Sequence, residues 1–294
     1  MLAHEMKLQW MVLALFMVLS KRQHCAAGDQ LDLFVFVAEI LGFHNYIPPF
    51  ATAREADMLY GLNYASGSAG IRDETGQELG ECISLNMQLQ NHHKTVQNLI
   101  GMLGNESALT YLNKCLYSVG MGNNDYLNNY FLPQFFPTSQ EYTLEKYTQL
   151  LIEQYSQQLR SLYESGARKL VVFGLGKIGC VPELLNDASR LFNSKLLPAI
   201  DLLNDDLPDA KIIYINSYRI GEDSTVLDLK VNNTACCPSS AVGQCIPGQI
   251  PCQNRTHTCS ETHSIRLRFL IFSTQRDLTV LATLPMLIHM IFAI

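Results

Sequence analysis

The amino-acid sequence predicts an α/β fold in which a parallel sheet lies between layers of helices. Short apolar runs typical of buried strands alternate with longer runs whose apolar residues recur at helical spacing. This alternation favours a doubly wound parallel sheet. The length of 294 residues suits one domain with a large core, and neither an internal repeat nor a linker divides the sequence.

Composition excludes two broad classes of protein. The net charge is −6, the isoelectric point is about 5.7 and no basic patch stands out, which argues against nucleic acid as a partner. Hydrophobic residues make up 48% and charged residues 16% of the sequence, which is far from the composition of disordered proteins.

The first 27 residues resemble a secretory leader. Lys7 supplies a positive charge, residues 10–19 form an apolar core, and residues 25–27 are small enough for cleavage. The core is too short to span a bilayer comfortably. We therefore expect a secreted, extracellular protein whose mature chain begins at Gly28, with a buried N-terminal helix as the alternative.

Cysteines and glycosylation sequons fit an oxidising compartment. Five of the nine cysteines crowd into one stretch rich in proline and glycine: Cys236, Cys237, Cys245, Cys252 and Cys259. The absence of a Cys-x-x-Cys pair favours disulfides over a zinc site, and we expect no bound metal. Asn-x-Ser/Thr sequons at Asn105, Asn232 and Asn254 predict a glycoprotein.

The stretch 115–126 carries the strongest functional signal from the residues themselves. A short apolar run predicts a buried strand, which opens into a polar loop at residues 122–125. Open α/β sheets place their chemistry just beyond the carboxyl ends of strands. The amide of Asn124 could stabilise a developing negative charge. The alternative is that this loop merely caps the next helix.

Hydrophobic spacing and breakers predict the remaining elements. We expect helices over residues 84–103, 143–165 and 182–206, and strands over residues 169–175 and 211–217. Gly166 is predicted to end the second helix, and Pro198 to interrupt the third.

Two local patterns on these elements are expected to carry no function. His92 and His93 lie on the first helix, where such a pair is more typical of a solvated face than of a catalytic site. Gly174, Gly176 and Gly179 follow a predicted strand, but their spacing is not that of a dinucleotide-binding loop.

Several ordered blocks resemble the plant GDSL-type esterase/lipase family, a branch of the SGNH hydrolases. Gly122, Asn124 and Asp125 match the Gly-x-Asn-Asp block of that family, and residues 63–70 match its glycine block. Further matches are residues 46–50, residues 71–76, residues 172–180 and the pair Cys236 and Cys237. The resemblance extends from about Val37 to Arg255.

This resemblance implies a three-layer α/β/α fold with a parallel flavodoxin-like sheet, and a cofactor-free reaction on small-molecule or lipid esters. In the family, a serine attacks the ester carbonyl, a histidine takes the serine proton, and an asparagine and backbone N–H groups stabilise the oxyanion. The resemblance assigns the oxyanion role to Asn124, with backbone donors near Gly67 or Gly70.

The resemblance fails at both ends, where the family carries its nucleophile and its base. No Gly-Asp-Ser occurs, and the nearest echo, residues 28–30, ends in a glutamine without a nucleophilic oxygen. Neither His257 nor His263 has an aspartate three positions before it. For residues 28–255 we therefore predict a hydrolase domain that lacks its nucleophile strand, with strand edges left unpaired in an incomplete sheet.

We interpret residues 256–294 as an aberrant apolar tail that begins where the reading frame changes, between Arg255 and Thr258. Codons permitted for residues 258–268, read from their third base, spell Leu, Phe, one unmatched position, Asp, Ala, Phe, His, Pro, Thr and Glu, which is the histidine block of the family in all but one place. Membrane association is expected only if residues 278–294 are a genuine anchor.

Three functional hypotheses follow from the sequence. The first is a family member, descended from an ester hydrolase, whose catalysis is impaired. The second is a non-catalytic secreted glycoprotein that binds a ligand. The third is a product of an altered transcript without a function of its own.

Overall fold

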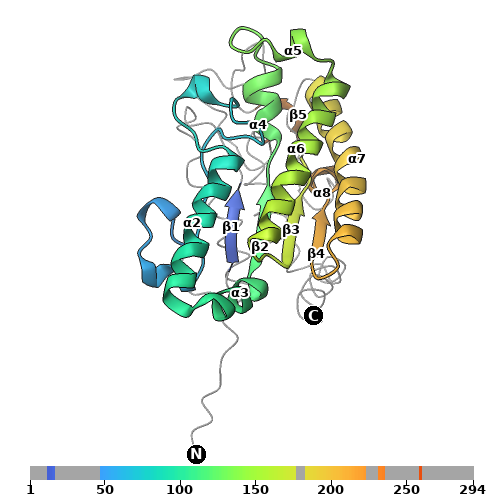
Figure 1. The fold of residues 1–294 in the computed structure, drawn as a ribbon. Coiled ribbons are helices and arrows are strands. Elements are labelled where there is room, and N and C mark those ends of the chain that lie inside the picture. Colours follow the sequence, from blue (N-terminus) through green and yellow to red (C-terminus); the bar gives the residue numbers. More distant parts are fainter. Residues whose placement is uncertain (1–11, 17–46, 177–182, 223–230, 236–257, 260–294) are drawn as a thin grey trace, which may run out of the picture.

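The computed structural model describes residues 12–16, 47–176, 183–222, 231–235 and 258–259. It confirms the predicted α/β class, because a parallel sheet is covered by helices (Figure 1). The sheet has four strands in the order β1-β2-β3-β4, which is small for this class and consistent with an incomplete version of the predicted fold.

All four strands run parallel and are five residues long. They are β1 (Val12–Phe16), β2 (Leu116–Gly120), β3 (Lys169–Phe173) and β4 (Lys211–Ile215). The register places Tyr117 beside Leu170, and Leu170 beside Ile212. Their carboxyl ends therefore meet at one edge of the sheet, where the chain continues from β2 into residues 122–125.

Strand β1 was not expected, because it lies within the predicted leader. It pairs with β2 along its whole length, from Val12 beside Leu116 to Phe16 beside Gly120. Strand β2 thus has a neighbour on each side, and the expected unpaired edge at β2 is wrong for the full chain. Residues 12–16 are apolar, and a short apolar run is typical both of the core of a secretory leader and of a buried strand. Leader cleavage and secretion remain predictions.

The longer helices are α2 (Leu85–Leu103), α3 (Asn105–Lys114), α6 (Leu144–Glu164), α7 (Glu183–Asp206) and α8 (Ser217–Glu222). The short helical turns are η1 (Phe50–Thr52), η2 (Glu55–Leu59), η3 (Gln77–Leu79), α4 (Asn123–Asp125), the π-helical turn η4 (Tyr126–Tyr130) and α5 (Thr138–Glu141). Helices α2 and α6 lie on the near face of the sheet in Figure 1.

Local signals explain where these helices begin and end. The hydroxyl of Ser84 accepts from the N–H of Met87 at the start of α2, and the hydroxyl of Thr143 accepts from the N–H of Lys146 at the start of α6. Beyond α6, Gly166 takes a φ of 103°, as predicted for a residue that follows a helix. The predicted bounds of both helices are confirmed.

The predicted interruption at Pro198 is wrong, because α7 continues through it. A proline inside a helix removes one backbone hydrogen bond and strains the preceding turn. Here Leu196 and Ile200, on either side of the proline, are almost completely buried. Burial of an apolar side chain contributes about 1.5 to 3 kcal/mol, which is enough to hold the helix together across the proline.

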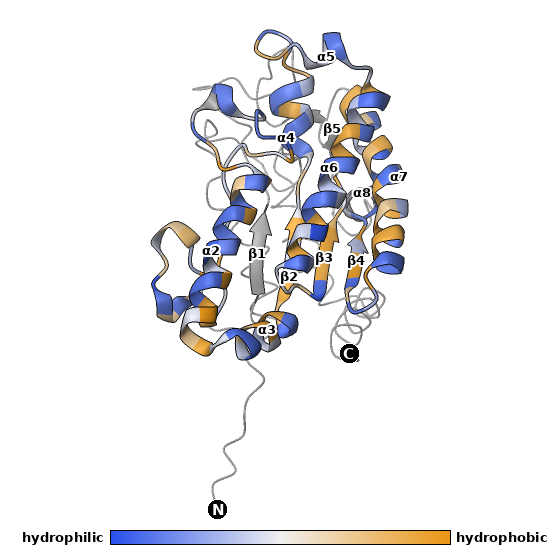
Figure 2. Cartoon of the chain, in the orientation of Figure 1, coloured by the Kyte–Doolittle hydropathy of each residue, from blue (hydrophilic) through white to orange (hydrophobic). Residues whose placement is uncertain are grey.

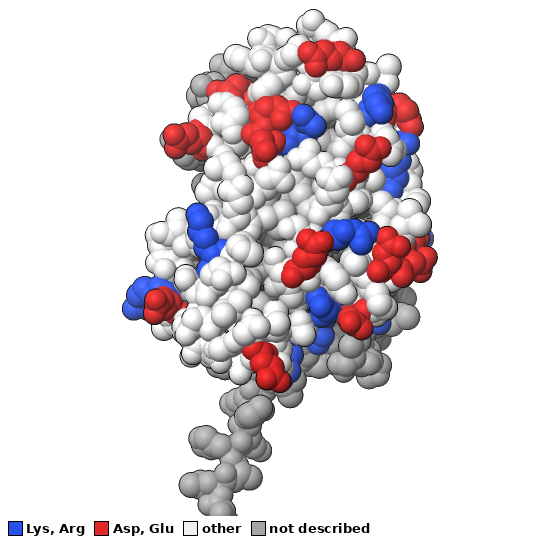
Figure 3. Space-filling model, viewed as in Figure 1, with Lys and Arg blue, Asp and Glu red and all other residues white. Residues whose placement is uncertain are grey.

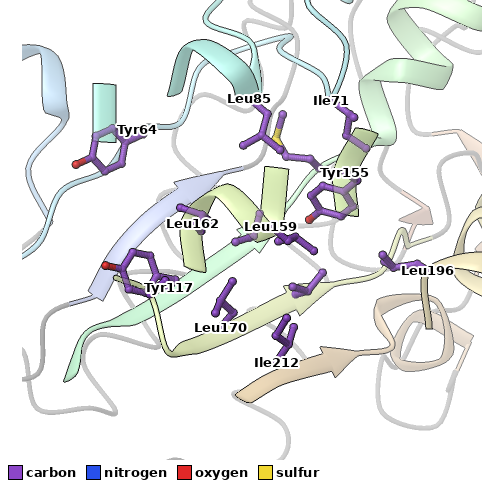
Figure 4. Packing of buried hydrophobic residues seen from close by; sticks show 14 of the residues in the cluster. Tyr64, Ile71, Leu85, Tyr117, Tyr155, Leu159, Leu162, Leu170, Leu196 and Ile212 are labelled. Atoms are coloured by element: carbon purple, nitrogen blue, oxygen red, sulfur yellow. The ribbon is translucent and has the colours of Figure 1, made fainter. Parts of the chain in front are cut away.

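The main core lies between the sheet and the helices of the near face. Figure 2 shows apolar residues on the sheet side of α2, α6 and α7, and Figure 4 shows Tyr117, Leu170 and Ile212 of the strands facing Leu159 and Leu162 of α6. Since side chains alternate along a strand, Leu116 and Val171 point to the other face and form a separate small cluster there.

The described part of the C-terminal region is a second, two-stranded parallel sheet of β5 (Val231–Ala235) and β6 (Thr258–Cys259). The rest of the cysteine-rich stretch, the sequon at Asn254, His257, His263 and the apolar residues 278–294 lie outside the described residues. Among the described helices, none has the length and apolarity needed to cross a membrane.

Candidate functional site

The polar loop after β2 turns sharply at Gly122. This residue has a φ of 122°, and a Cβ there would lie 3.1 Å from Leu175 and 3.2 Å from Phe192, so both its conformation and its surroundings favour glycine. The turn directs residues 123–125 into the helical turn α4, whose N-cap is Gly122. The loop residues are therefore the first turn itself, and their side chains do not cap it.

Asn124 is buried at this turn and contacts the glycine block. Its Nδ2 donates to the carbonyl of Ala69 at 2.7 Å, and its Oδ1 accepts from Nδ2 of Asn128 at 2.8 Å. These two bonds fix which way the amide points. An amide nitrogen carries two hydrogens, so one donor of Asn124 is left for a ligand. The two blocks meet although 55 residues separate Asn124 from Ala69.

Gly70 is the buried residue at the other side of this contact. A Cβ there would lie 2.5 Å from Oδ1 of Asp125 and 2.6 Å from Cγ2 of Thr75, so the approach of the two segments requires glycine. The carbonyl of Gly70 accepts from the N–H of Leu85 at 3.0 Å. Within the described residues its own N–H makes no hydrogen bond. Since C=O and N–H point in opposite directions across a trans peptide, this N–H is directed away from the Ala69 carbonyl that Asn124 contacts.

The structure places Gly67 differently. It is exposed at the tip of a turn that is closed by the N–H of Ala69 and the carbonyl of Ser66 at 3.4 Å. The positive φ of this turn, 65°, is at Ser68. No hydrogen bond joins Gly67 to Asn124 in the described part of the chain. Of the two predicted backbone donors, Gly70 is thus the one that lies next to the Asn124 contact.

Asp125 holds the segment after Gly70 in place, a role that we did not anticipate from the sequence. Its carboxylate is completely buried and accepts from the N–H of Ile71 at 2.8 Å, the N–H of Arg72 at 3.0 Å and the hydroxyl of Thr75 at 2.8 Å. We call these four residues the Asp125 clamp. Burial raises the pKa of Asp125 to about 6, although the three hydrogen bonds act in the opposite direction.

Helix α6 supports the clamp from the other side. The carbonyl of Ile71 accepts from Nε2 of Gln154 at 2.8 Å and from Nε2 of Gln158 at 2.9 Å. The N–H and the carbonyl of Ile71 are therefore both satisfied, and the segment next to Gly70 has little freedom to move. The only sequence signal for this arrangement was the position of Asp125 beside Asn124 in the matched block.

His92 does not lie on a solvated face, so that expectation is wrong for it, whereas it is confirmed for the exposed His93. The His92 ring packs edge-on against Tyr64 at 5.8 Å and Tyr117 at 5.6 Å, and neither ring nitrogen has a hydrogen-bond partner. We call these three residues the His92 ring cluster. Burial, with a smaller effect from His93, lowers the pKa of His92 to about 3.

Because its ring is inaccessible, His92 does not provide a general base. No serine hydroxyl is hydrogen-bonded to a histidine ring in the described part of the chain. The described residues also include no group of His, Cys, Asp and Glu side chains that could hold a metal ion. What the described residues bring together is the amide of Asn124 and the glycine block, joined by the hydrogen bond from Asn124 to the carbonyl of Ala69.

Gly174, directly after β3, is required by packing, whereas Gly179 lies outside the described residues. A Cβ at Gly174 would collide with Tyr214 and with Asn193 of α7. The next residue, Leu175, exchanges two backbone hydrogen bonds of 2.7 Å with the Asn193 side chain. Gly174 therefore lies where a strand and a helix approach each other closely.

Comparison with known proteins gives consistent similarities. The GDSL-like Lipase/Acylhydrolase family matches residues 35–265. The chain is 45% identical over 244 residues to GDSL esterase/lipase At5g45670 of Arabidopsis thaliana, covering 74% of this chain and 67% of the relative. It is 45% identical over 240 residues to GDSL esterase/lipase At1g29670 of the same plant, covering 74% of this chain and 66% of the relative. The chain thus spans about two thirds of the length of these relatives.

Proposed function

Because the chain belongs to the GDSL-like lipase/acylhydrolase family, we propose that it is an ester hydrolase by descent whose own catalysis is impaired. The observation that carries this proposal is the contact between the two matched blocks, where Asn124 donates to the carbonyl of Ala69 and no serine–histidine pair occurs among the described residues. The substrate class is an acyl ester of a small molecule or a lipid, and the reaction needs no cofactor.

The chemistry of this half-site is electrostatic. When a nucleophile attacks an ester carbonyl, the oxygen becomes an anion, and donors that already point at it stabilise the transition state without rearrangement. The amide of Asn124 is held by Ala69 and Asn128, and Gly70 is held in place through the Asp125 clamp. Loss of one such donor costs about 100- to 1,000-fold in rate in an active hydrolase.

Impairment follows from the groups that the sequence lacks. A serine nucleophile and its histidine base act as one unit, and an enzyme without them keeps only the weak catalysis that binding and the oxyanion donors provide. The sequence contains neither a Gly-Asp-Ser nor an Asp-x-x-His block. We expect the chain to bind an ester in the orientation for attack and to release it unchanged.

Hydrolysis of short-chain nitrophenyl esters tests this proposal. The parent chain should show no turnover above background, and Asn124→Ala should behave identically, because an oxyanion donor helps only when an oxyanion forms. A robust rate that falls on Asn124→Ala would overturn the proposal and indicate a nucleophile that the sequence analysis missed.

A secreted binding glycoprotein is the second candidate function, favoured by the intact Asp125 clamp and by the exposed position of Asn105, the sequon residue at the start of α3. Saturable binding of a non-hydrolysable acyl ester, weakened by Asn124→Ala, would support it. A chain that fails to leave the cell would instead support the product of an altered transcript. Sequencing the transcript tests the frame change, since the shifted codons must spell Asp-Ala-Phe-His.

A further inference from the structure

A groove on the near face of the sheet lies outside the ester half-site and carries its own chemistry. It runs between α2 and α6 and has a volume of about 750 Å³, within the range of small-molecule sites. Its lining side chains come from both helices and from the segment after Gly70: Arg72, Asp73, Asn86, Leu89, Gln90, His93, Leu150, Glu153, Gln154, Gln157, Gln158, Ser161 and Ser165.

Side-chain amides dominate this lining. Asn86 and Gln90 come from α2, and Gln154, Gln157 and Gln158 come from α6. Each amide offers both a donor and an acceptor, and two serine hydroxyls add further capacity of both kinds. Such a surface suits a neutral ligand with many hydroxyl groups.

The charged side chains of the groove do not favour an ion. Arg72 is paired with Glu74, and both oxygens of Asp73 accept from Nδ2 of Asn86 at 3.0 and 3.1 Å. Both signs of charge are interspersed with uncharged surface on the face that α2 and α6 form (Figure 3). A surface of this kind attracts neither anions nor cations strongly.

Gln158 forms the floor of the groove. It is only 4% exposed, and its Nε2 donates to the carbonyl of Ile71 at 2.9 Å and to Oδ1 of Asn86 at 2.7 Å. Its Oε1 is buried and has no partner. Because this oxygen is buried, a ligand in the groove does not reach it. Gln158 contributes instead by holding the carbonyl of Ile71 and the side chain of Asn86 in place.

Leu89 on α2 and Leu150 on α6 provide apolar contact on the two walls, and both are partly buried. A sugar ring combines hydroxyl groups at its rim with apolar C–H faces, so amides and leucines together match its two kinds of surface. We propose that the groove between α2 and α6 binds a neutral saccharide, whose hydroxyl groups exchange hydrogen bonds with the exposed amides of Gln90 and Gln157 and with the partly exposed amide of Gln154.

Titration of the ¹⁵N-labelled full chain with cellobiose tests this site. The side-chain amide signals of Gln90, Gln154 and Gln157 should shift together and saturate below about 50 mM sugar, the weak affinity expected of an open polar groove. Glucuronate should bind at least about fivefold more weakly than cellobiose, because Asp73 and Glu153 line the groove while Arg72 is already paired with Glu74. Cellohexaose distinguishes a polysaccharide chain, which should bind more tightly, from a free disaccharide.

Variants on the groove rim keep the test independent of folding. Gln90 and Gln157 are exposed, so the double substitution Gln90→Ala with Gln157→Ala should leave the fold intact and weaken cellobiose binding at least about fivefold. The matched control is Gln140→Ala, an exposed glutamine on α5, which should bind like the parent. Absence of saturable shifts, equal binding by the double variant, or tighter binding of glucuronate would overturn the proposal.

Discussion

Asp125 and His92 are both completely buried ionisable residues, yet the fold surrounds them in opposite ways. The carboxylate of Asp125 has three hydrogen-bond donors from a single segment of chain. The ring of His92 has two aromatic neighbours and no hydrogen bond at either nitrogen. Burial is the largest influence on both pKa values, raising one to about 6 and lowering the other to about 3.

The surroundings of Asp125 position the candidate site, whereas the surroundings of His92 contribute to the core. Hydrogen bonds are directional, so the Asp125 clamp fixes where Gly70 and its N–H lie relative to Asn124. Ring contacts are less directional, and the His92 ring cluster works as part of the core between α2 and β2. A buried polar group specifies a site when its partners come from the segment that it must position.

Removal of the clamp should have the largest effect. Asp125→Ala leaves two backbone N–H groups and one hydroxyl without their acceptor, and each unmet buried group costs about 1 to 3 kcal/mol. We expect a loss of about 3 to 6 kcal/mol in the free energy of unfolding in urea. The exposed Asp209→Ala is the control and should change stability by less than about 0.5 kcal/mol. A small effect of Asp125→Ala would mean that the clamp does not hold Gly70.

The two groups should also respond to pH in opposite directions. The folded pKa of His92 lies below its ordinary value, so its contribution is complete above about pH 6.5 and falls by about 1.4 kcal/mol per unit as the pH drops toward 3. The folded pKa of Asp125 lies above its ordinary value of 3.8, so its contribution is complete below about pH 3.8 and is lost as the pH rises through about 6.

Urea midpoints between pH 4 and pH 6 separate these two contributions. As the pH rises from 4 to 6, the stability of His92→Leu relative to the parent chain should fall by about 2.5 kcal/mol, and that of Asp125→Asn should rise by about 2 kcal/mol. His93→Leu, at an exposed neighbour, should follow the parent. Parallel profiles for all of these proteins would show that neither buried group titrates differently in the folded state.

Two glycine substitutions compare a crowded position with an open one. Gly70→Ala places a methyl group against Asp125 and Thr75 and should cost about 1 to 3 kcal/mol by thermal unfolding. Gly101→Ala places the same group in open space on α2 and should stabilise the chain by about 0.5 to 1 kcal/mol. Equal effects of the two substitutions would contradict the close packing of Gly70.

The smallest expected effect concerns the strand beside the His92 ring cluster. In the parallel register Leu13 of β1 lies next to Tyr117 of β2. A chain that starts at Gly28 lacks β1, so amide hydrogens of β2 should exchange about tenfold faster than in the full chain, while those of α6 stay unchanged. Equal protection of β2 in both chains would show that β1 contributes nothing to the sheet.

Parts of the fold and site were predictable because their cause is local. Hydrophobic spacing and capping residues place α2 and α6 within one or two residues of their observed ends. The spacing of Leu85, Gln88, His92, Val96 and Leu99 is that of one buried helical stripe, so the burial of His92 could have been inferred from that stripe. A histidine is expected at the surface from its residue type, but the position of His92 within the buried stripe of α2 determines that it is buried.

The sequence by itself determined the α/β class, helices α2, α6 and α7, the family and the pairing of Asn124 with a glycine block, because periodicity, caps and ordered motifs are properties of the sequence. Only the tertiary structure decided that Gly70 and not Gly67 lies beside Asn124, that Asp125 with Gln154 and Gln158 of α6 holds Ile71, and that residues 12–16 pair with β2. These arrangements join residues more than 50 positions apart, and their hydrogen bonds form only when packing has removed water from both partners.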